Sequence, residues 1–68
     1  MLTRGMSHEE VMAIVEGQDW EVLEERLYEE DGEEWTEMTI WQGDHAVAIT
    51  IDEEGVYEIQ YVPAWALD

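Results

Sequence analysis

The side chains that could carry catalysis or hold a metal ion are few and poorly spaced. The chain has two histidines, His8 and His45, one serine, Ser7, and no cysteine. The histidines lack the His-x-x-x-His spacing that puts two imidazoles on one helix face, and no Gly-x-Ser-x-Gly motif surrounds the serine. Neither 29–34 nor 52–55 follows the twelve-residue calcium loop.

Paired carboxylates could in principle hydrolyse a glycosidic bond. A chain of 68 residues with a filled core, however, leaves little room for a substrate pocket. We therefore expect no catalytic residue, no metal and no cofactor, and we predict that the protein is not an enzyme.

Acidic side chains dominate the composition. Nineteen Asp and Glu against two Arg and no Lys give a formal net charge of −17. Such a chain cannot neutralise phosphates, so we expect it to bind neither nucleic acid nor an anionic membrane surface. No apolar run approaches the ~18 residues of a membrane span, and the first residues do not resemble a signal peptide. We therefore expect a cytoplasmic protein, whose self-repulsion is a cost that suggests a use for the charge.

The first element that the sequence predicts is a helix over residues 7–16. Ser7 and Glu10 form a capping box, and apolar residues follow at helical spacing. Gly17 is expected to end the helix in the C-cap position. Residues 1–6 are expected to be flexible.

Three turns predict an antiparallel meander after this helix. Asp31-Gly32 and Gly43-Asp44 are two-residue hairpin signals, and Glu53-Glu54-Gly55 fits a three-residue loop. The implied cross-strand pairs are Tyr28 with Trp35, Arg26 with Glu37, Leu23 with Ile40, Ile40 with Val47, Met38 with Ile49, Ile51 with Tyr57, Ile49 with Ile59, and Val47 with Tyr61.

The predicted fold is α+β: one N-terminal helix packed on a four-stranded antiparallel β-meander, in a single domain over 1–68 with a C-terminal tail over 63–68. The alternative has two helices followed by a three-stranded sheet, because Trp20, Leu23 and Leu27 also fit helical spacing.

The registers predict two different sheet faces. The face covered by the helix collects Leu23, Leu27, Met38, Ile40, Val47, Ile49, Ile51, Tyr57, Ile59 and Tyr61. The opposite face collects Glu24, Glu37 and Glu58 beside Tyr28, Trp35, Trp41, Val56 and Val62. The acidic runs 29–34 and 52–54 fall at the same end, because the first and third turns of a meander share an end. The tail either covers the aromatic residues or leaves them open.

Carboxylates steer association with a basic partner, and tryptophan anchors interfaces. We therefore predict a partner-binding surface made of Glu24, Glu29, Glu30, Asp31, Glu33, Glu34, Trp35, Glu37, Trp41, Asp52, Glu53, Glu54 and Glu58.

In acidity, brevity and aromatic content the whole chain resembles small phage-encoded inhibitors that imitate DNA, among them anti-CRISPR proteins, anti-restriction proteins and uracil-DNA glycosylase inhibitors. The resemblance is one of class. It implies a partner with a basic nucleic-acid-binding surface, such as a subunit of a CRISPR–Cas complex, and action in the cytoplasm of the host cell.

Two other interpretations stay open. An immunity or antitoxin protein that blocks a basic nuclease would need the same acidic surface. Adaptation to high salt would need no partner, although the excess of 14 Glu over 5 Asp speaks against it. A domain that folds only in molar salt would favour this last interpretation. The oligomeric state is open, with a monomer favoured.

Overall fold

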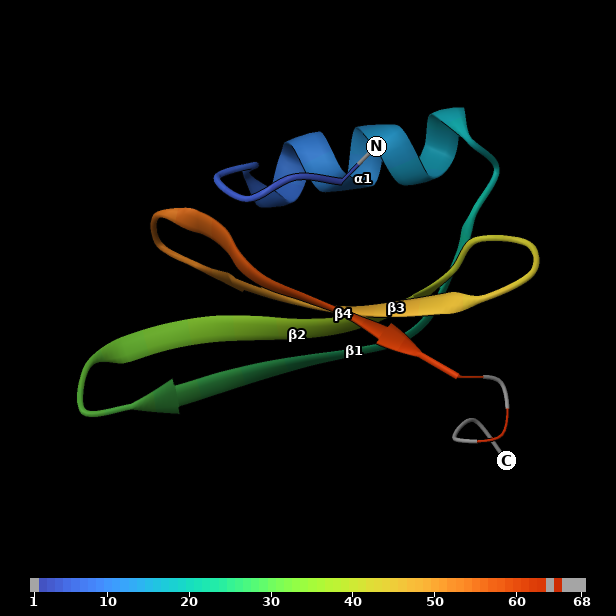
Figure 1. Ribbon diagram of the computed structural model, residues 1–68. Helices are drawn as coiled ribbons and strands as arrows, with labels where there is room; N and C mark the ends of the chain where they lie inside the picture. The colour runs from blue at the N-terminus through green and yellow to red at the C-terminus, as the bar shows by residue number, and fades with distance from the viewer. Residues whose placement is uncertain (1, 64, 66–68) are drawn as a thin grey trace.

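The computed structural model describes residues 2–63 and 65. A helix, α1 (His8–Gly17), precedes four strands, β1 (Glu21–Glu30), β2 (Glu33–Trp41), β3 (Ala46–Asp52) and β4 (Gly55–Val62). The strands form one antiparallel sheet in the order β1-β2-β3-β4, and α1 lies on one of its faces (Figure 1). The predicted α+β fold is confirmed. Residues 21–30 form a strand, so the two-helix alternative is wrong.

Helix α1 begins at the predicted capping box. The backbone N–H of Glu10 donates to Ser7 Oγ at 3.2 Å, and the N–H of Ser7 donates to Glu10 Oε1 at 3.3 Å. The other end differs from the prediction, because Gly17 is still helical and Gln18 is the C-cap.

The residue with left-handed backbone after α1 is Asp19, at φ 59°. The N–H of Asp19 donates to the carbonyl of Glu16, and that of Trp20 to the carbonyl of Val15. These are the two bonds of a Schellman motif. Its apolar partner is Trp20, which packs against the core. An aspartate tolerates this conformation better than most residues. The left-handed residue therefore lies two positions after Gly17, the glycine that was expected to end the helix.

The first two hairpins have the predicted turns. Asp31 and Gly32 both have positive φ, at 51° and 82°, as a type I′ turn requires. Gly43 also has positive φ, and Gln42 donates a backbone hydrogen bond to His45 across the second turn. The predicted pairs that the structure confirms are Tyr28 with Trp35, Arg26 with Glu37, Ile40 with Val47, Met38 with Ile49, Ile49 with Ile59, and Val47 with Tyr61.

Two register shifts change the remaining pairs. Between Val22 and Glu24 the β1–β2 register shifts, so that Val22 rather than Leu23 lies opposite Ile40. Leu23 becomes the extra residue of a bulge and is 46% exposed. The prediction that it lies in the core-facing set is therefore wrong.

The second shift lies between Thr50 and Ile51, where Ile51 pairs with Val56 instead of Tyr57. Tyr57 is left as the extra residue and is 49% exposed, whereas Val56 is buried in the core. Gly55 pairs with Asp52, so the third loop has two residues, Glu53 and Glu54, and the predicted three-residue loop is wrong. The shorter loop moves Val56 and Tyr57 from their predicted positions, and the bulge restores the predicted register from Glu58 onward.

Backbone hydrogen bonds with the N-terminal segment hold Val56 in its position at the start of β4. Gly5 donates a hydrogen bond to the carbonyl of Val56 at 2.8 Å, and Val56 donates to the carbonyl of Met6 at 2.9 Å. Leu2 is part of the core. Residues 2–6 thus make specific contacts with the start of β4, where the sequence predicted a flexible segment.

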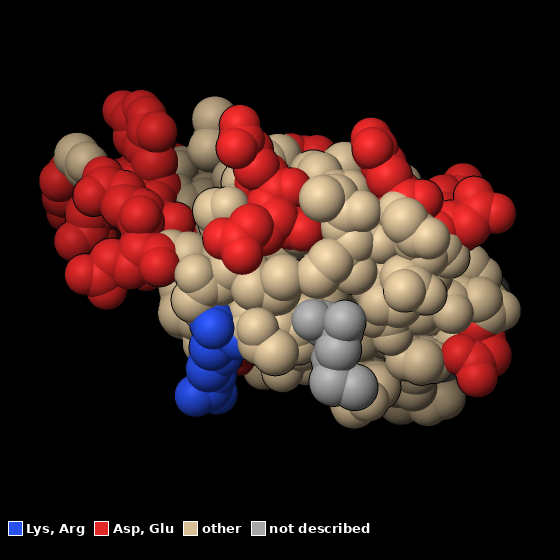
Figure 2. Space-filling model, turned by 90° about the horizontal axis from the view of Figure 1, so that it is seen from above, with Lys and Arg blue, Asp and Glu red and all other residues tan. Residues whose placement is uncertain are grey.

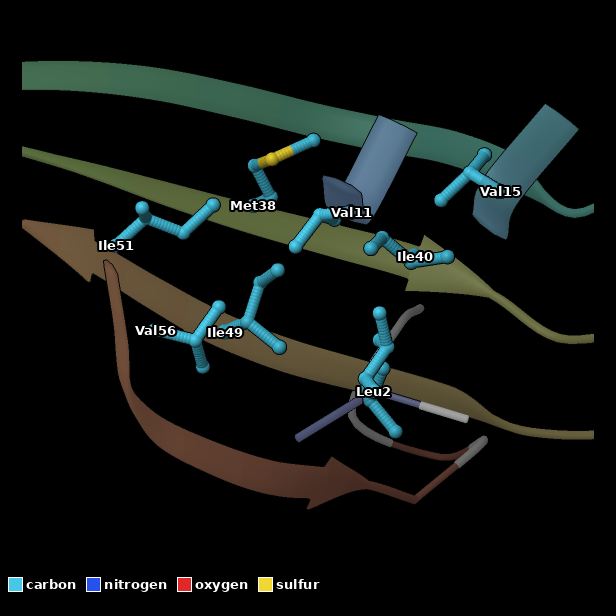
Figure 3. Packing of buried hydrophobic residues seen from close by; sticks show 9 residues of the cluster. Leu2, Val11, Val15, Met38, Ile40, Ile49, Ile51 and Val56 are labelled. Carbon is cyan, nitrogen blue, oxygen red and sulfur yellow. The ribbon is translucent and has the colours of Figure 1, made fainter. Parts of the chain in front are cut away.

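The core lies between α1 and the sheet (Figure 3). Val11 and Val15 of the helix meet Met38, Ile40 and Ile49 from the central strands. Leu27 is in its predicted register but is 71% exposed, because the β1–β2 hairpin extends beyond the start of α1 (Figure 1). Tyr61, on the edge strand β4, is also exposed.

Candidate partner-binding surface

The tips of the β1–β2 and β3–β4 hairpins lie at the same end of the sheet (Figure 1), and residues of both line one hollow. We call this region the acidic end. Eight of its nine residues, 29–34 and 52–54, are acidic: Glu29, Glu30, Asp31, Glu33, Glu34, Asp52, Glu53 and Glu54. Figure 2, seen from the helix side, shows Asp and Glu side chains crowded most densely there. The prediction that the two acidic runs fall at the same end of the sheet is confirmed.

The acidic end contains a hollow of about 290 Å³ between the two tips. Its walls are five carboxylates and two aromatic rings: Glu33, Glu34, Asp52, Glu53, Glu54, Trp35 and Tyr57. None of these described lining residues is basic. The backbone N–H of Glu54 donates to Asp52 Oδ1 at 2.8 Å, which orders the turn and leaves the carboxylates of Glu53 and Glu54 exposed.

The β1–β2 tip places like charges directly opposite each other. Glu29 pairs with Glu34, and Glu30 pairs with Glu33. Opposed like charges destabilise an antiparallel pair, and no basic side chain forms an ion pair with these four glutamates within residues 2–63 and 65. The fold therefore accepts a local electrostatic cost at its most exposed hairpin.

An aromatic pair supports the acidic end. The rings of Tyr28 and Trp35 stack with centroids 5.6 Å apart and an angle of 13°. Both are half-buried, so the pair gives the hairpin a rigid apolar surface next to the carboxylates. Trp41, the second predicted anchor, lies at the opposite end of β2, opposite Ala46. The structure thus brings Trp35 to the acidic end and keeps Trp41 away from it.

The sheet face away from α1 carries a second acidic group. One cross-strand row runs Arg26, Glu37, Thr50 and Glu58, and the next runs Glu24, Thr39, Ala48 and Gln60. These eight residues line a shallow hollow of about 310 Å³. The prediction that Glu24, Glu37 and Glu58 share this face is confirmed by the register.

Arg26 is held inside this acidic group. A hydrogen bond with the Tyr28 side chain and the charge of Glu24 raise the pKa of its guanidinium, and its Nε forms an ion pair with Glu24. Gln60 Nε2 donates to Glu58 Oε1 at 2.6 Å, which orients that carboxylate without neutralising it. Among residues 2–63 and 65, neither Glu37 nor Glu58 forms an ion pair, although Arg26 lies directly opposite Glu37 in the register.

Sequence reasoning missed Tyr57 and Arg26 as members of the surface. Tyr57 reaches the acidic end through the bulge, and the signal that could have found it is Gly55 of β4, since a glycine in a strand often marks a bulge. Arg26 was seen only as the partner of Glu37. We left open whether the tail 63–68 covers the aromatic residues of this face. Most of the tail lies outside the described residues; of those described, Trp65 is 79% exposed.

No protein-family model, no curated protein and no solved structure matches this chain. Across residues 2–63 and 65, no helix is long and apolar enough to cross a membrane. The same residues contain no group of three or more His, Asp or Glu placed to hold a metal ion.

Proposed function

We propose that this protein is a DNA-mimic inhibitor that blocks the nucleic-acid-binding surface of a basic protein, with a subunit of a CRISPR–Cas complex as the target. In this proposal it acts as a monomer in the cytoplasm, that of the host cell if a phage encodes it. It touches neither nucleic acid nor membrane. The observation that carries the proposal is the acidic end, where two hairpin tips carry eight carboxylates, five of which line one hollow.

The charge density supports this proposal. The surface of 4937 Å² carries 17 net charges, or about 290 Å² for each. Duplex DNA has one charge per ~1.7 Å of axis, roughly 105 Å² for each on a cylinder of ~10 Å radius. With eight of nine residues acidic, the acidic end lies well above the protein's mean and closer to the value for DNA.

The way in which the charges are held also supports it. The backbone that carries these acids is already folded into hairpins, so binding does not have to order it, which lowers the entropic cost of association. Opposed pairs such as Glu30 with Glu33 gain most from a partner's Lys or Arg, because binding relieves their repulsion. Trp35 and Tyr57 add apolar contact area beside the carboxylates.

The proposal predicts a specific charge dependence. Tagged protein is used to capture partners from host lysate, and duplex DNA is added as competitor. We expect recovery of a nucleic-acid-binding complex that DNA displaces, with affinity falling steeply between low and moderate salt. A variant with Glu33→Gln, Glu53→Gln and Glu54→Gln should lose capture, and purified target should then bind DNA in its presence.

The matched control removes the same charge elsewhere. Glu9→Gln, Glu16→Gln and Glu21→Gln lie at exposed positions on α1 and at the start of β1, and this variant should retain capture. Equal loss in both variants would mean that only total charge matters and would overturn the proposal. Recovery of a nuclease toxin instead would assign the same surface to an immunity protein.

A further inference from the structure

The second surface to account for is the sheet face away from α1, which we call the open face. Its central residues are Glu24, Arg26, Glu37, Thr39, Ala48, Thr50, Glu58 and Gln60. Among the described residues, α1 is on the other side of the sheet (Figure 1). A four-stranded sheet covered on one face has space for a second layer on the other.

The open face has the relief of a trough. Its floor is β3, which carries the small side chains of Ala48 and Thr50. Longer side chains stand on the two neighbouring strands, Glu37 on β2 and Glu58 and Gln60 on β4. The two strand spacings between β2 and β4 make the trough about 10 Å wide. An α-helix with its side chains is about 10–12 Å across.

The trough also has a defined length and two aromatic ends. Trp35 and Trp41 lie on this face six positions apart on β2, a distance of about 20 Å in a strand. The same distance corresponds to about 13 residues of α-helix. A short helix laid along the strands would therefore reach from the Tyr28–Trp35 stack towards Trp41.

The negative charge of the open face distinguishes between the partners that could bind there. Arg26 forms its ion pair with Glu24, and within residues 2–63 and 65 neither Glu37 nor Glu58, on the two sides of Thr50, forms one. A second copy of this chain would bring another net charge of −17 and is repelled. A helix with an apolar or small stripe and Lys or Arg along its flanks matches both the floor and the walls.

We infer that the open face is a docking trough for a basic amphipathic helix of the partner, about three to four turns long. This rests on the proposed function, because it assumes the same basic partner, and it adds a second contact on a different side of the molecule. The helix places its small side chains over Ala48 and its basic flanks against Glu37 and Glu58.

The test uses a synthetic helical peptide of about 14 residues with an Ala/Leu stripe flanked by Arg. A scrambled peptide of the same composition and charge is the control. Titration into the isotope-labelled protein at about 0.15 M salt, where exposed charges are screened beyond ~8 Å, is followed by amide NMR shifts. We expect saturable shifts centred on Thr39, Ala48 and Thr50, and weaker binding of the scrambled peptide.

Two matched variants locate the site without changing the charge. Ala48→Tyr fills the floor of the trough, whereas Ala13→Tyr adds the same ring to the exposed side of α1. We expect the first to weaken peptide binding at least about tenfold, ~1.4 kcal/mol, and the second to leave it unchanged. Far-UV circular dichroism checks that both variants fold.

The outcomes separate this inference from the proposed function. Equal binding by both peptides, peptide shifts confined to the acidic end, or equal affinity of the two tyrosine variants would overturn the trough. Capture of the partner, lost on neutralising Glu33, Glu53 and Glu54, would then still stand. Self-association in sedimentation that Ala48→Tyr abolishes would also overturn it, in favour of a second copy.

Discussion

Gly55 is the position where one added methyl group should cost most. Its φ is +112°, which side-chain-bearing residues rarely adopt. A Cβ there would lie 2.7 Å from the carbonyl oxygen of Gly5 and 2.8 Å from that of Met6. Both neighbours are backbone atoms, so no side-chain rotation relieves the overlap. Gly55→Ala must displace the N-terminal segment.

The cost can be worked out from these contacts. A residue forced into a rare backbone conformation costs about 1–3 kcal/mol. Displacement of the segment removes two hydrogen bonds with Val56, at about 1 kcal/mol each. We therefore expect Gly55→Ala to lower the free energy of unfolding by about 3–5 kcal/mol. That approaches the total stability of about 3–5 kcal/mol expected for a domain of this size.

Gly32→Ala is the matched control, because Gly32 also has positive φ, +82°, but nothing lies within 4 Å of an added Cβ. We expect it to cost about 1–2 kcal/mol. Urea and thermal unfolding followed by circular dichroism measure both variants, and about 1 kcal/mol shifts Tm by roughly 4–8 °C. Equal losses in the two variants would refute the reasoning. Fast hydrogen exchange at the Val56 amide in the wild-type protein would refute it independently of any variant.

Four further predictions concern stability. Gly17→Ala should raise the free energy of unfolding by about 0.4–1 kcal/mol, because Gly17 is helical and an added methyl meets nothing within 4 Å; a loss in urea unfolding would contradict the helix end described above. Ser7→Ala should lower it by about 1 kcal/mol through loss of the cap, and Ser7→Asp should retain most of it. Glu29→Gln with Glu30→Gln should raise Tm by relieving two opposed pairs, whereas an unchanged Tm would mean that solvent already screens them. The domain should fold in dilute buffer and gain Tm with added salt; a chain unfolded there by circular dichroism would instead support adaptation to high salt.

Local signals were sufficient for most of the fold. Asp31-Gly32 and Gly43-Asp44 set two hairpin registers, because a turn type and its length determine which residues face each other. The capping box at Ser7 likewise depends on residues only three apart. Each of these interactions is complete within a few residues of sequence, so the sequence pattern contains the whole interaction.

The features that the sequence did not predict depend on distant contacts. The bulge at Tyr57 occurs where residues 5 and 6 pair with Val56, about 50 residues away in the chain. Asp19, and not a glycine, has the left-handed backbone after α1, and Trp20, which follows it, packs against the core. Turn and cap preferences cannot include partners that only folding brings close. The same limit hid Tyr57 from the predicted binding surface.

The glutamates at the β1–β2 tip of the acidic end do not contribute to the hydrophobic core. All nine core residues lie between α1 and the sheet, and the four opposed glutamates of the β1–β2 tip are exposed. Removing their charge leaves the core intact and relieves repulsion, so these residues lower stability in the free protein. Binding of the basic partner proposed above would reverse that sign, because a ligand that binds only the folded state stabilises it. A variant that has a higher free energy of unfolding and captures less partner would therefore show that these glutamates lower stability and support binding.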